Sequence, residues 1–278
     1  MLLSVVIPAY NEEENIGKTL AEVARVLREE AIPYELIVVN DNSRDGTQRV
    51  IEACMRGDPG VRLVNRRPPG GFGRAIRSGL TEVQGEVVVI FMADFSDDPR
   101  DLVQYYRKIQ EGYDCVFGTR FSPQSTVSNY PKLKLFVNRL VNKLIQVLFW
   151  TDHNDMTNAF KAYRTEVIRE CGPYTASHFN ITIEMSLSAH IRKYTIAKIP
   201  INWHGRTWGM SNLRLRQMGR RYLSTLLKLF LEKTLIIDDV ISERLAKHTQ
   251  GSAAQAQQGE RLEELEKRVA ALERRLPP

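Results

Sequence analysis

The sequence predicts an α/β fold in which a mixed, mostly parallel sheet is flanked by helices. Short apolar runs rich in β-branched residues occur at 2–7, 36–39 and 87–91, as expected of strands that are covered on both faces. Between them, residues 12–30 and 47–55 have the apolar spacing of helices. Alternating strands and helices are the pattern of βαβ units, and therefore of a parallel sheet.

The chain continues with further elements of both kinds. Residues 101–110 are predicted to form a helix, and the short segment 115–118 that follows is typical of a strand. Residues 194–201 predict another strand late in the chain. Together with the first three strands, these elements give the mixed sheet and its flanking helices.

Two longer segments predict helices with a marked apolar side. Residues 133–150 place apolar side chains at intervals of three and four, with Lys134, Arg139 and Lys143 between them, which predicts an amphipathic helix. Residues 222–236 predict a second apolar helix. Such helices either lie on a membrane surface or pack onto the sheet, and the sequence leaves both alternatives open. No run of about 18 uninterrupted apolar residues occurs, so no transmembrane helix is expected.

The composition is that of an ordinary folded protein with a mild excess of positive charge. The chain has 278 residues and a formal net charge of +6, which allows one large domain or two small ones and favours phosphate-bearing partners. No nucleic-acid partner is expected, because the basic residues do not alternate with aromatic residues in a stripe. Three scattered cysteines and the lack of a signal peptide predict a cytoplasmic location, with peripheral membrane association as a further expectation.

The C-terminal segment differs in composition from the rest. Residues 236–260 are predicted to be a linker, because much of this stretch is rich in Gln, Ala, Ser and Gly. Residues 261–276 carry apolar residues at intervals of three and four between complementary charges, which predicts a short coiled-coil helix. The fold is therefore expected to have a helical extension at its C-terminus. We therefore expect a homo-oligomer joined through this helix. The alternative is a solvated C-terminal helix, because only two heptads are present.

Polar clusters follow three of the predicted strands directly. They comprise residues 8–14, 40–47 and 92–99. Ligands of open α/β sheets bind at the carboxyl ends of the strands, where such clusters lie side by side. One cluster alone would be explained by a helix cap, for which Ser43 and Asp98 are suited. Three clusters together predict one binding crevice.

These clusters resemble the donor half of family 2 glycosyltransferases, which have the Rossmann-like GT-A fold. The chain is more similar to the polyprenol-phosphate sugar transferases of that family. The segments that carry the resemblance are Pro8-Ala9-Tyr10-Asn11-Glu12, Asn40-Asp41, 66–79 (RRPPGGFGRAIRSG), Gly118-Thr119-Arg120-Phe121, 155–161 (DMTNAFK) and Arg206-x-x-Gly209-x-Ser211. The resemblance implies a glycosyltransferase domain over residues 1–235, with a donor half at 1–120 and an acceptor half at 121–235.

A site for a nucleotide diphosphate sugar is implied by the resemblance, with GDP-sugars and UDP-sugars both open. In this family, the carboxylate at the position of Asp41 accepts hydrogen bonds from the base. Glycines would allow the backbone to approach the diphosphate closely, although a flexible turn is the alternative interpretation of that segment. The residues expected to bind the nucleotide sugar are Pro8, Tyr10, Asn11, Glu12, Asn40, Asp41, Gly71, Gly73, Arg74, Ala93 and Asp94.

The predicted metal site departs from the family pattern. A D-x-D motif holds Mg²⁺ or Mn²⁺ against the diphosphate, but here Met92 replaces its first aspartate, and a thioether is a poor ligand for a hard cation. The expectation is a metal bound by Asp94 and Ser96 with the donor phosphates, helped by Asp97 or Asp98. Weak metal affinity, or basic residues in place of a metal, are the alternatives.

The resemblance alone implies the acceptor. It makes Asp94, Arg120, Arg139 and Arg206 the catalytic set, with the arginines meeting the phosphate of a polyprenyl phosphate at a membrane surface. This phosphate is already ionised, so it attacks the sugar without a strong base, and catalysis is mainly positioning and charge stabilisation. Inversion at the anomeric carbon is expected from the family.

Two other functions stay open on the sequence. A soluble saccharide, protein or metabolite acceptor is favoured by Met92, by Asn212 in place of a usual lysine, and by the absence of predicted transmembrane helices. A non-catalytic nucleotide-sugar-binding scaffold is favoured by the altered D-x-D motif. Asp155 matches a family aspartate, with a turn cap as its alternative role, and Glu184 is a weaker candidate for a sugar or acceptor contact.

Overall fold

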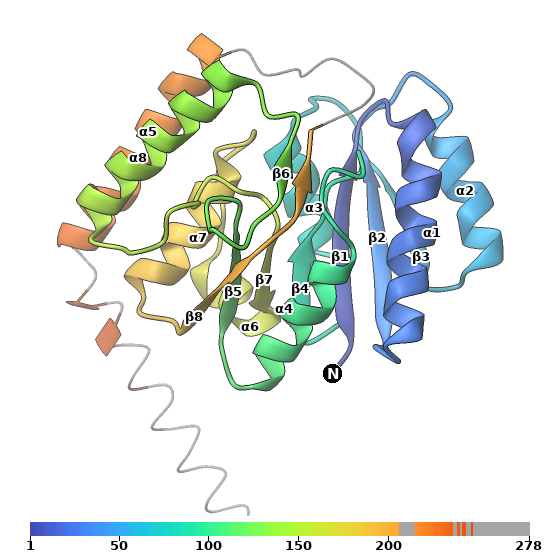
Figure 1. Cartoon of the computed structure of the whole chain (residues 1–278), viewed down its shortest axis with the longest axis horizontal. Helices are drawn as coiled ribbons and strands as arrows, with labels where there is room; N and C mark the ends of the chain where they lie inside the picture. Colours follow the sequence, from blue (N-terminus) through green and yellow to red (C-terminus); the bar gives the residue numbers. More distant parts are fainter. Residues whose placement is uncertain (206–214, 236–237, 240, 243–245, 247–278) are drawn as a thin grey trace, which may run out of the picture. The chain divides into compact units, whose positions relative to one another are not determined.

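The structure is a computed structural model, and the residues that it describes are 1–205, 215–235, 238–239, 241–242 and 246 (Figure 1). Met1–Phe230 form one compact unit. The predicted coiled-coil helix, nearly all of the predicted linker and Arg206 lie outside the described residues. The domain boundaries and the oligomer inferred from that segment therefore stay predictions.

A seven-stranded sheet forms the centre of this unit, in the order β3-β2-β1-β4-β7-β5-β8. Its strands are β1 (Leu3–Ala9), β2 (Tyr34–Asn40), β3 (Val61–Asn65), β4 (Val87–Ile90), β5 (Cys115–Thr119), β7 (Lys161–Arg164) and β8 (Ile196–Pro200). β7 runs antiparallel to both of its neighbours, whereas the other neighbouring pairs are parallel. The predicted mixed, mostly parallel sheet is confirmed. A separate parallel pair is formed by β6 (Val127–Ser128) and β9 (Trp203–His204).

Helices cover both faces of the sheet. They are α1 (Glu13–Glu29), α2 (Thr47–Gly57), α3 (Phe72–Leu80), α4 (Arg100–Gln110), α5 (Lys132–Phe149), α6 (Thr165–Cys171), α7 (Ile181–Ile191) and α8 (Leu215–Leu235). Val5 and Ile7 of β1 are buried in one cluster with apolar residues of α1 and α4. Val6 faces α3 instead, since a Cβ added at Gly79 would lie 2.4 Å from its Cγ1 atom. Burial on both faces explains why the central strands are nearly continuous apolar runs.

The sequence pattern did not indicate β3, β7 or α3. β3 lies at the edge of the sheet, and Val61 alone among its residues is fully buried. β7 begins with Lys161, a residue type that is rarely found inside a sheet. α3 begins at Phe72, within the glycine-rich segment. The interpretation of that segment as a flexible turn is therefore wrong from residue 72 onward.

α5 and α8 lie side by side (Figure 1), with the rings of Phe149 and Phe230 6.4 Å apart. Both helices expose large apolar side chains, which we call the apolar face. Its residues are Leu133, Phe136, Leu140, Leu144 and Val147 on α5 and Leu223 and Leu227 on α8. Packing against the rest of the unit thus buries the apolar side chains on only one side of each helix, and those of the apolar face stay exposed. Within the described ranges, no helix is long and apolar enough to cross a membrane.

Candidate active site

The strand order places a switch point between β1 and β4. From β1 the chain continues to β2 and β3 on one side, and it then crosses to β4 on the other side. At such a point the loops leave the carboxyl ends of the strands in opposite directions and open a ligand-binding crevice. The three polar clusters follow β1, β2 and β4, so they lie at the same edge of the sheet.

Hydrogen bonds tie the loop after β1 to the loop after β2. The backbone N–H of Asn11 donates to Ser43 Oγ (3.0 Å), and Asn11 Oδ1 accepts from the N–H of Arg44 (2.8 Å). The N–H of Glu12 donates to Thr47 Oγ1 (2.8 Å). Asn11 has a positive φ of 54°, a conformation that asparagine tolerates better than most residues. Asn11 and Glu12 therefore shape the crevice by fixing the loop after β1 against the loop after β2.

The other predicted residues of these loops differ in exposure. Pro8 lies within β1, opposite Val39. Asn40 is buried at the end of β2, and its Nδ2 donates to Asn65 Oδ1 (2.9 Å). Tyr10 is 44% exposed, so its ring is accessible to a ligand.

Asp41 holds the glycine-rich segment against the end of β2. Its Oδ2 accepts from the backbone N–H of Gly71 (2.6 Å), and its Oδ1 forms an ion pair with Arg66. Arg74 donates from Nη1 to the carbonyl of Gly70 (2.9 Å). A carboxylate offers about four acceptor positions. A nucleotide base that reached Asp41 would therefore share this carboxylate with Gly71 and Arg66.

Gly73 is required for a close backbone contact at the start of α3. A Cβ added there would lie 2.5 Å from the carbonyl oxygen of Ala176 and 2.8 Å from that of His178. Next to it, the rings of Phe72 and Phe179 stack with their centroids 4.3 Å apart. The close approach predicted for a diphosphate is thus made at Gly73 by the chain itself, through the loop between α6 and α7.

We predict that Gly73→Ala lowers the free energy of unfolding by about 1–3 kcal/mol, as overpacking of a tight site does. The added methyl group has to displace backbone atoms rather than a flexible side chain. Urea denaturation followed by circular dichroism measures the change. Gly57→Ala is the matched control, because nothing lies within 4 Å of a Cβ at Gly57. Equal losses in the two variants would contradict this account.

Asp94 follows β4 at the position predicted for a metal ligand. It is buried, and its Oδ1 accepts from the N–H of Ser96 (3.1 Å); Ala93 beside it is buried too. Asp97 is 2% exposed, and neither of its carboxylate oxygens has a hydrogen-bond partner among the described residues. Burial, followed by the negative charge of Asp94, raises the pKa of Asp97 to about 8. A bound cation would relieve the repulsion between these two carboxylates.

These residues fit a hard divalent cation whose ligand set is completed by the substrate. In the part of the chain that the structure describes, no group of three or more His, Cys, Asp or Glu residues is arranged to hold a metal. Mg²⁺ is often bound through one or two carboxylates together with substrate phosphates and water. Asp94 would supply such a carboxylate, and Ser96 would supply a hydroxyl two residues later. Met92 adds no suitable ligand.

Arg120 and Asp155 form a buried, bidentate ion pair. Arg120 Nε and Nη2 lie 2.8 and 2.7 Å from the two oxygens of Asp155, and the backbone N–H of Arg120 donates to the same carboxylate (3.0 Å). Their side chains are only 8% and 1% exposed. Burial opposes the charge of Arg120, but Asp155 outweighs it and holds the pKa of Arg120 above its usual range. Asp155 therefore orients Arg120, rather than serving as the turn cap considered for it.

Arg120 and Arg139 meet around the ring of Phe121. Their guanidinium carbons lie 5.5 and 4.9 Å from its centroid, and Arg120 also lies 5.8 Å from the ring of Trp203. Arg139 is exposed on α5. The structure thus brings together two of the predicted acceptor arginines, while the third, Arg206, lies outside the described residues.

Lys161 holds the loop that carries Asp155, a role that the sequence pattern did not indicate. Its Nζ donates to the carbonyls of Met156 and Asn158, at 2.6 Å each, and the residue is 1% exposed. Burial lowers the pKa of Lys161 to about 7, against the opposing attraction of Asp155. The only sequence signal was the lysine at the end of the 155–161 motif.

Known proteins share both the sequence and the fold of this chain. The family described as Glycosyl transferase family 2 matches residues 4–172. The chain is 28% identical over 215 residues to the polyprenol monophosphomannose synthase of Mycolicibacterium smegmatis, which covers 75% of this chain and 80% of that protein. It is 30% identical over 171 residues to the undecaprenyl-phosphate 4-deoxy-4-formamido-L-arabinose transferase of Shewanella sediminis, which covers 60% of this chain and 49% of that protein.

A solved structure has the same arrangement of sheet and helices. Glucosyl-3-phosphoglycerate synthase from Mycobacterium tuberculosis, in complex with Mn²⁺, UDP and phosphoglyceric acid, matches with a TM-score of 0.64 and 22% identity, over 82% of this chain and 78% of that chain. The same enzyme is also known with Mg²⁺ and UDP. This likeness establishes the GT-A fold. Because the family match spans more than half of the chain, the protein belongs to Glycosyl transferase family 2 and is a glycosyltransferase.

Proposed function

We propose that this glycosyltransferase transfers a sugar from a nucleotide diphosphate sugar to a polyprenyl phosphate, with inversion and with the help of a divalent cation. The observation that carries the proposal is the pairing of Arg120 and Arg139 around Phe121, because Arg139 belongs to α5, the helix that bears the exposed apolar face. The names of two relatives, which act on polyprenol and undecaprenyl phosphate, support the acceptor class. The UDP and Mn²⁺ complex of a protein with the same fold supports the donor class and the metal.

The donor would occupy the crevice at the carboxyl ends of β1, β2 and β4. Tyr10 offers an accessible ring for the base, and Asp41 offers its remaining acceptor capacity. Asp94 and Ser96 would hold Mg²⁺ or Mn²⁺ against the diphosphate. When bound, the cation neutralises negative charge on the leaving nucleotide diphosphate.

The acceptor phosphate would be bound by Arg120 and Arg139. Asp155 occupies the Nε and Nη2 donors of Arg120, which leaves the Nη1 donors for a phosphate oxygen. A phosphate oxygen forms a bond to the anomeric carbon while the bond from that carbon to the diphosphate oxygen breaks, and the nucleotide diphosphate leaves with the electron pair. The acceptor is ionised at neutral pH, so the arginines act by positioning and by charge stabilisation.

A lipid acceptor requires contact with a membrane surface, and the apolar face supplies one. Leu133, Phe136, Leu140, Leu144 and Val147 recur at intervals of three and four along one side of α5, and they are between 47% and 67% exposed. Lys134, Arg139 and Lys143 on the same helix suit anionic headgroups. An amphipathic helix of this composition binds in the plane of a membrane surface.

We predict that Leu140→Asp weakens binding to vesicles of anionic phospholipid by about tenfold or more, because a buried leucine side chain contributes about 1.5–3 kcal/mol of transfer free energy. Leu140 is 61% exposed, so its replacement should leave the melting temperature nearly unchanged. Co-sedimentation with vesicles measures the binding. Gln48→Asp, which adds the same charge at an exposed position of α2, is the control. Unchanged binding of Leu140→Asp would contradict this role of α5.

Turnover with a panel of nucleotide sugars tests the function as a whole. The purified chain is incubated with each donor, Mn²⁺ or Mg²⁺, and polyprenyl phosphate in detergent, and the glycosylated lipid is detected by mass spectrometry. The expected result is one preferred donor and a rate well above hydrolysis by water. The alternative of a soluble acceptor, which Met92 favours, predicts no increase on adding the lipid. That outcome would overturn the proposed acceptor.

A further inference from the structure

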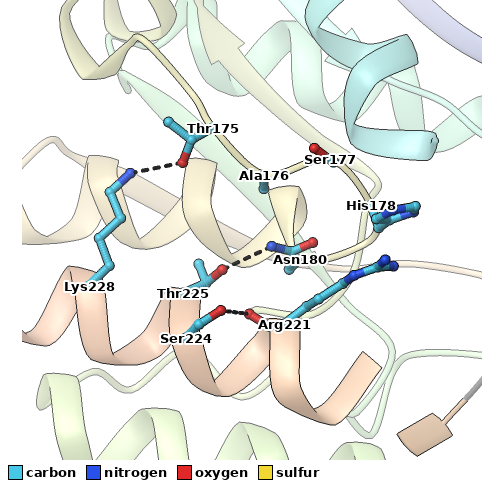
Figure 2. Close-up of a pocket in the computed structure, with 9 residues that line it drawn as sticks. All are labelled: Thr175, Ala176, Ser177, His178, Asn180, Arg221, Ser224, Thr225 and Lys228. Atoms are coloured by element: carbon cyan, nitrogen blue, oxygen red, sulfur yellow. Dashed lines mark hydrogen bonds between the residues drawn. The ribbon is translucent and has the colours of Figure 1, made fainter. Parts of the chain in front are cut away.

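A polar pocket of about 380 Å³ lies between α8 and the loop 172–180 that joins α6 to α7 (Figure 2). None of its lining residues belongs to the donor or acceptor residues predicted from the sequence. Volumes above about 300 Å³ are typical of sites for small ligands. The chemistry of the pocket is set by the residues Arg221, His178, Asn180, Thr225 and Lys228.

Glu184, buried beside the pocket, is already neutralised by the protein. Its carboxylate accepts from the backbone N–H of Ala176 (2.8 Å), from Thr175 Oγ1 (2.9 Å) and from Lys228 Nζ (2.8 Å). Burial raises the pKa of Glu184, but these partners, Lys228 first, outweigh burial and hold the pKa below its usual value. The negative charge of Glu184 is thus matched by Lys228, and the sugar or acceptor contact considered for Glu184 is replaced by this structural role.

The positive charge of Arg221 has no such match. No carboxylate in the described part of the chain pairs with its guanidinium, which points to the same side of the pocket as the ring of His178 (Figure 2). Burial and then the charges of Arg221 and Arg74 lower the pKa of His178. The charges of two arginines therefore act on one partly buried ring, against a smaller opposing attraction from Asp41. This end of the pocket has a local excess of positive charge that an anion would offset.

Asn180 provides an unsatisfied polar group in the same place. It is 6% exposed; its Nδ2 donates to Thr225 Oγ1 (2.9 Å), and its Oδ1 has no hydrogen-bond partner among the described residues. In Figure 2 this oxygen points toward the side of the pocket where His178 and Arg221 lie. The two ends of an amide are interchangeable by rotation. After rotation, Thr225 donates to the amide oxygen, and the NH₂ group becomes a donor for a ligand oxygen.

We propose that this pocket binds a phosphate group through Arg221, His178 and the amide of Asn180. A phosphate presents several strong acceptor oxygens, and arginine matches it with a fork of N–H donors. The tetrahedral anion would offset the charge of Arg221 and accept the bond that the rotated amide offers. Hydroxyl groups of Ser224 and Thr225, which also line the pocket, are within the same polar surface.

The pocket also adjoins the glycine-rich segment. The N–H of Gly73 donates to the carbonyl of Ser177 (3.1 Å), and a Cβ at Gly71 would lie 3.3 Å from Cε1 of His178. A phosphate bound to His178 and Arg221 would therefore connect α8 with the loop that supports the start of α3. Binding is thus expected to stabilise the fold, independently of whether any sugar is transferred.

Titration with inorganic phosphate, at ionic strength matched by sodium chloride, tests the site in the full chain. Phosphate should raise the melting temperature and give a saturable heat of binding in calorimetry. Arg221→Gln should weaken phosphate binding by about 10- to 100-fold, as expected for the loss of a charge-assisted hydrogen bond. Asn180→Asp, which keeps the shape but adds a negative charge, should weaken it as well. Arg220→Gln removes the same charge at the neighbouring exposed position of α8 and should change the affinity by no more than about twofold.

Vesicles distinguish the two sources of the phosphate group. If the ligand is a lipid headgroup, Arg221→Gln weakens binding to phosphatidic acid vesicles, and inorganic phosphate competes with them. If the ligand is a soluble phosphate compound, Arg221→Gln weakens phosphate binding and leaves vesicle binding unchanged. Equal phosphate affinity of the wild type and Arg221→Gln, an equal loss in Arg220→Gln, or no saturable phosphate binding would overturn the proposal. These readouts do not require activity, so they are independent of the proposed function.

Discussion

Replacing Asp94 with asparagine is expected to lower the rate of sugar transfer by about 100- to 1,000-fold, which corresponds to about 3–4 kcal/mol of lost transition-state stabilisation. Met92 stands where a second carboxylate would be, so in the proposed site Asp94 would carry the charge contact with the cation without that partner. Asparagine keeps the shape and one acceptor oxygen for the N–H of Ser96, but it lacks the negative charge. The loss should therefore appear in kcat and in the metal requirement rather than in stability.

Initial rates over a range of Mn²⁺ concentrations, with the preferred donor and acceptor, measure this effect. Asp114→Asn is the control, because Asp114 Oδ2 accepts from the N–H of Thr195 (2.7 Å) at the amino end of β5, away from the carboxyl edge that carries the site. Weakening that contact should cost about 1 kcal/mol of stability at most and leave the metal dependence unchanged. An Asp94→Asn variant with the wild-type rate and metal dependence would remove Asp94 from the metal site.

The sheet and the edge that carries the site could be predicted from the sequence because both follow from local patterns. Strands buried on both faces are nearly continuous apolar runs, as β1, β2 and β4 are, and the polar residues that follow each run have to lie at its carboxyl end. Once the strands are parallel, these ends share one edge of the sheet. The position of the crevice therefore needed no knowledge of contacts between distant residues.

The contacts that fix the site side chains depend on residues far apart in the chain, so no local pattern reveals them. Arg120 and Asp155 are 35 positions apart, and they meet because antiparallel β7 follows the loop of Asp155 and pairs with β5. The same holds for Asp41, whose partner Arg66 is 25 positions away. The sequence identified both acidic residues by resemblance, but their partners could be known only from the fold.

The buried pair of Arg120 and Asp155 predicts the largest effect on stability. Asp155→Ala should lower the free energy of unfolding by about 3–5 kcal/mol, the usual cost of leaving one member of a buried ion pair without its partner. Arg120 is 8% exposed, so water cannot replace the carboxylate without opening the site. The backbone N–H of Arg120 would lose its acceptor in the same variant. Urea denaturation measures the loss.

A double variant separates the stabilising role of this pair from its role in transfer. Arg120→Met combined with Asp155→Leu removes both charges, and apolar side chains in place of a buried ion pair often restore stability. The double variant should therefore be more stable than Asp155→Ala, yet it should still lack transfer activity because no guanidinium at position 120 meets the acceptor phosphate. Wild-type activity in a stable double variant would show that the pair only supports the fold. Recovered stability without activity would show that transfer needs the guanidinium of Arg120 apart from its part in supporting the fold.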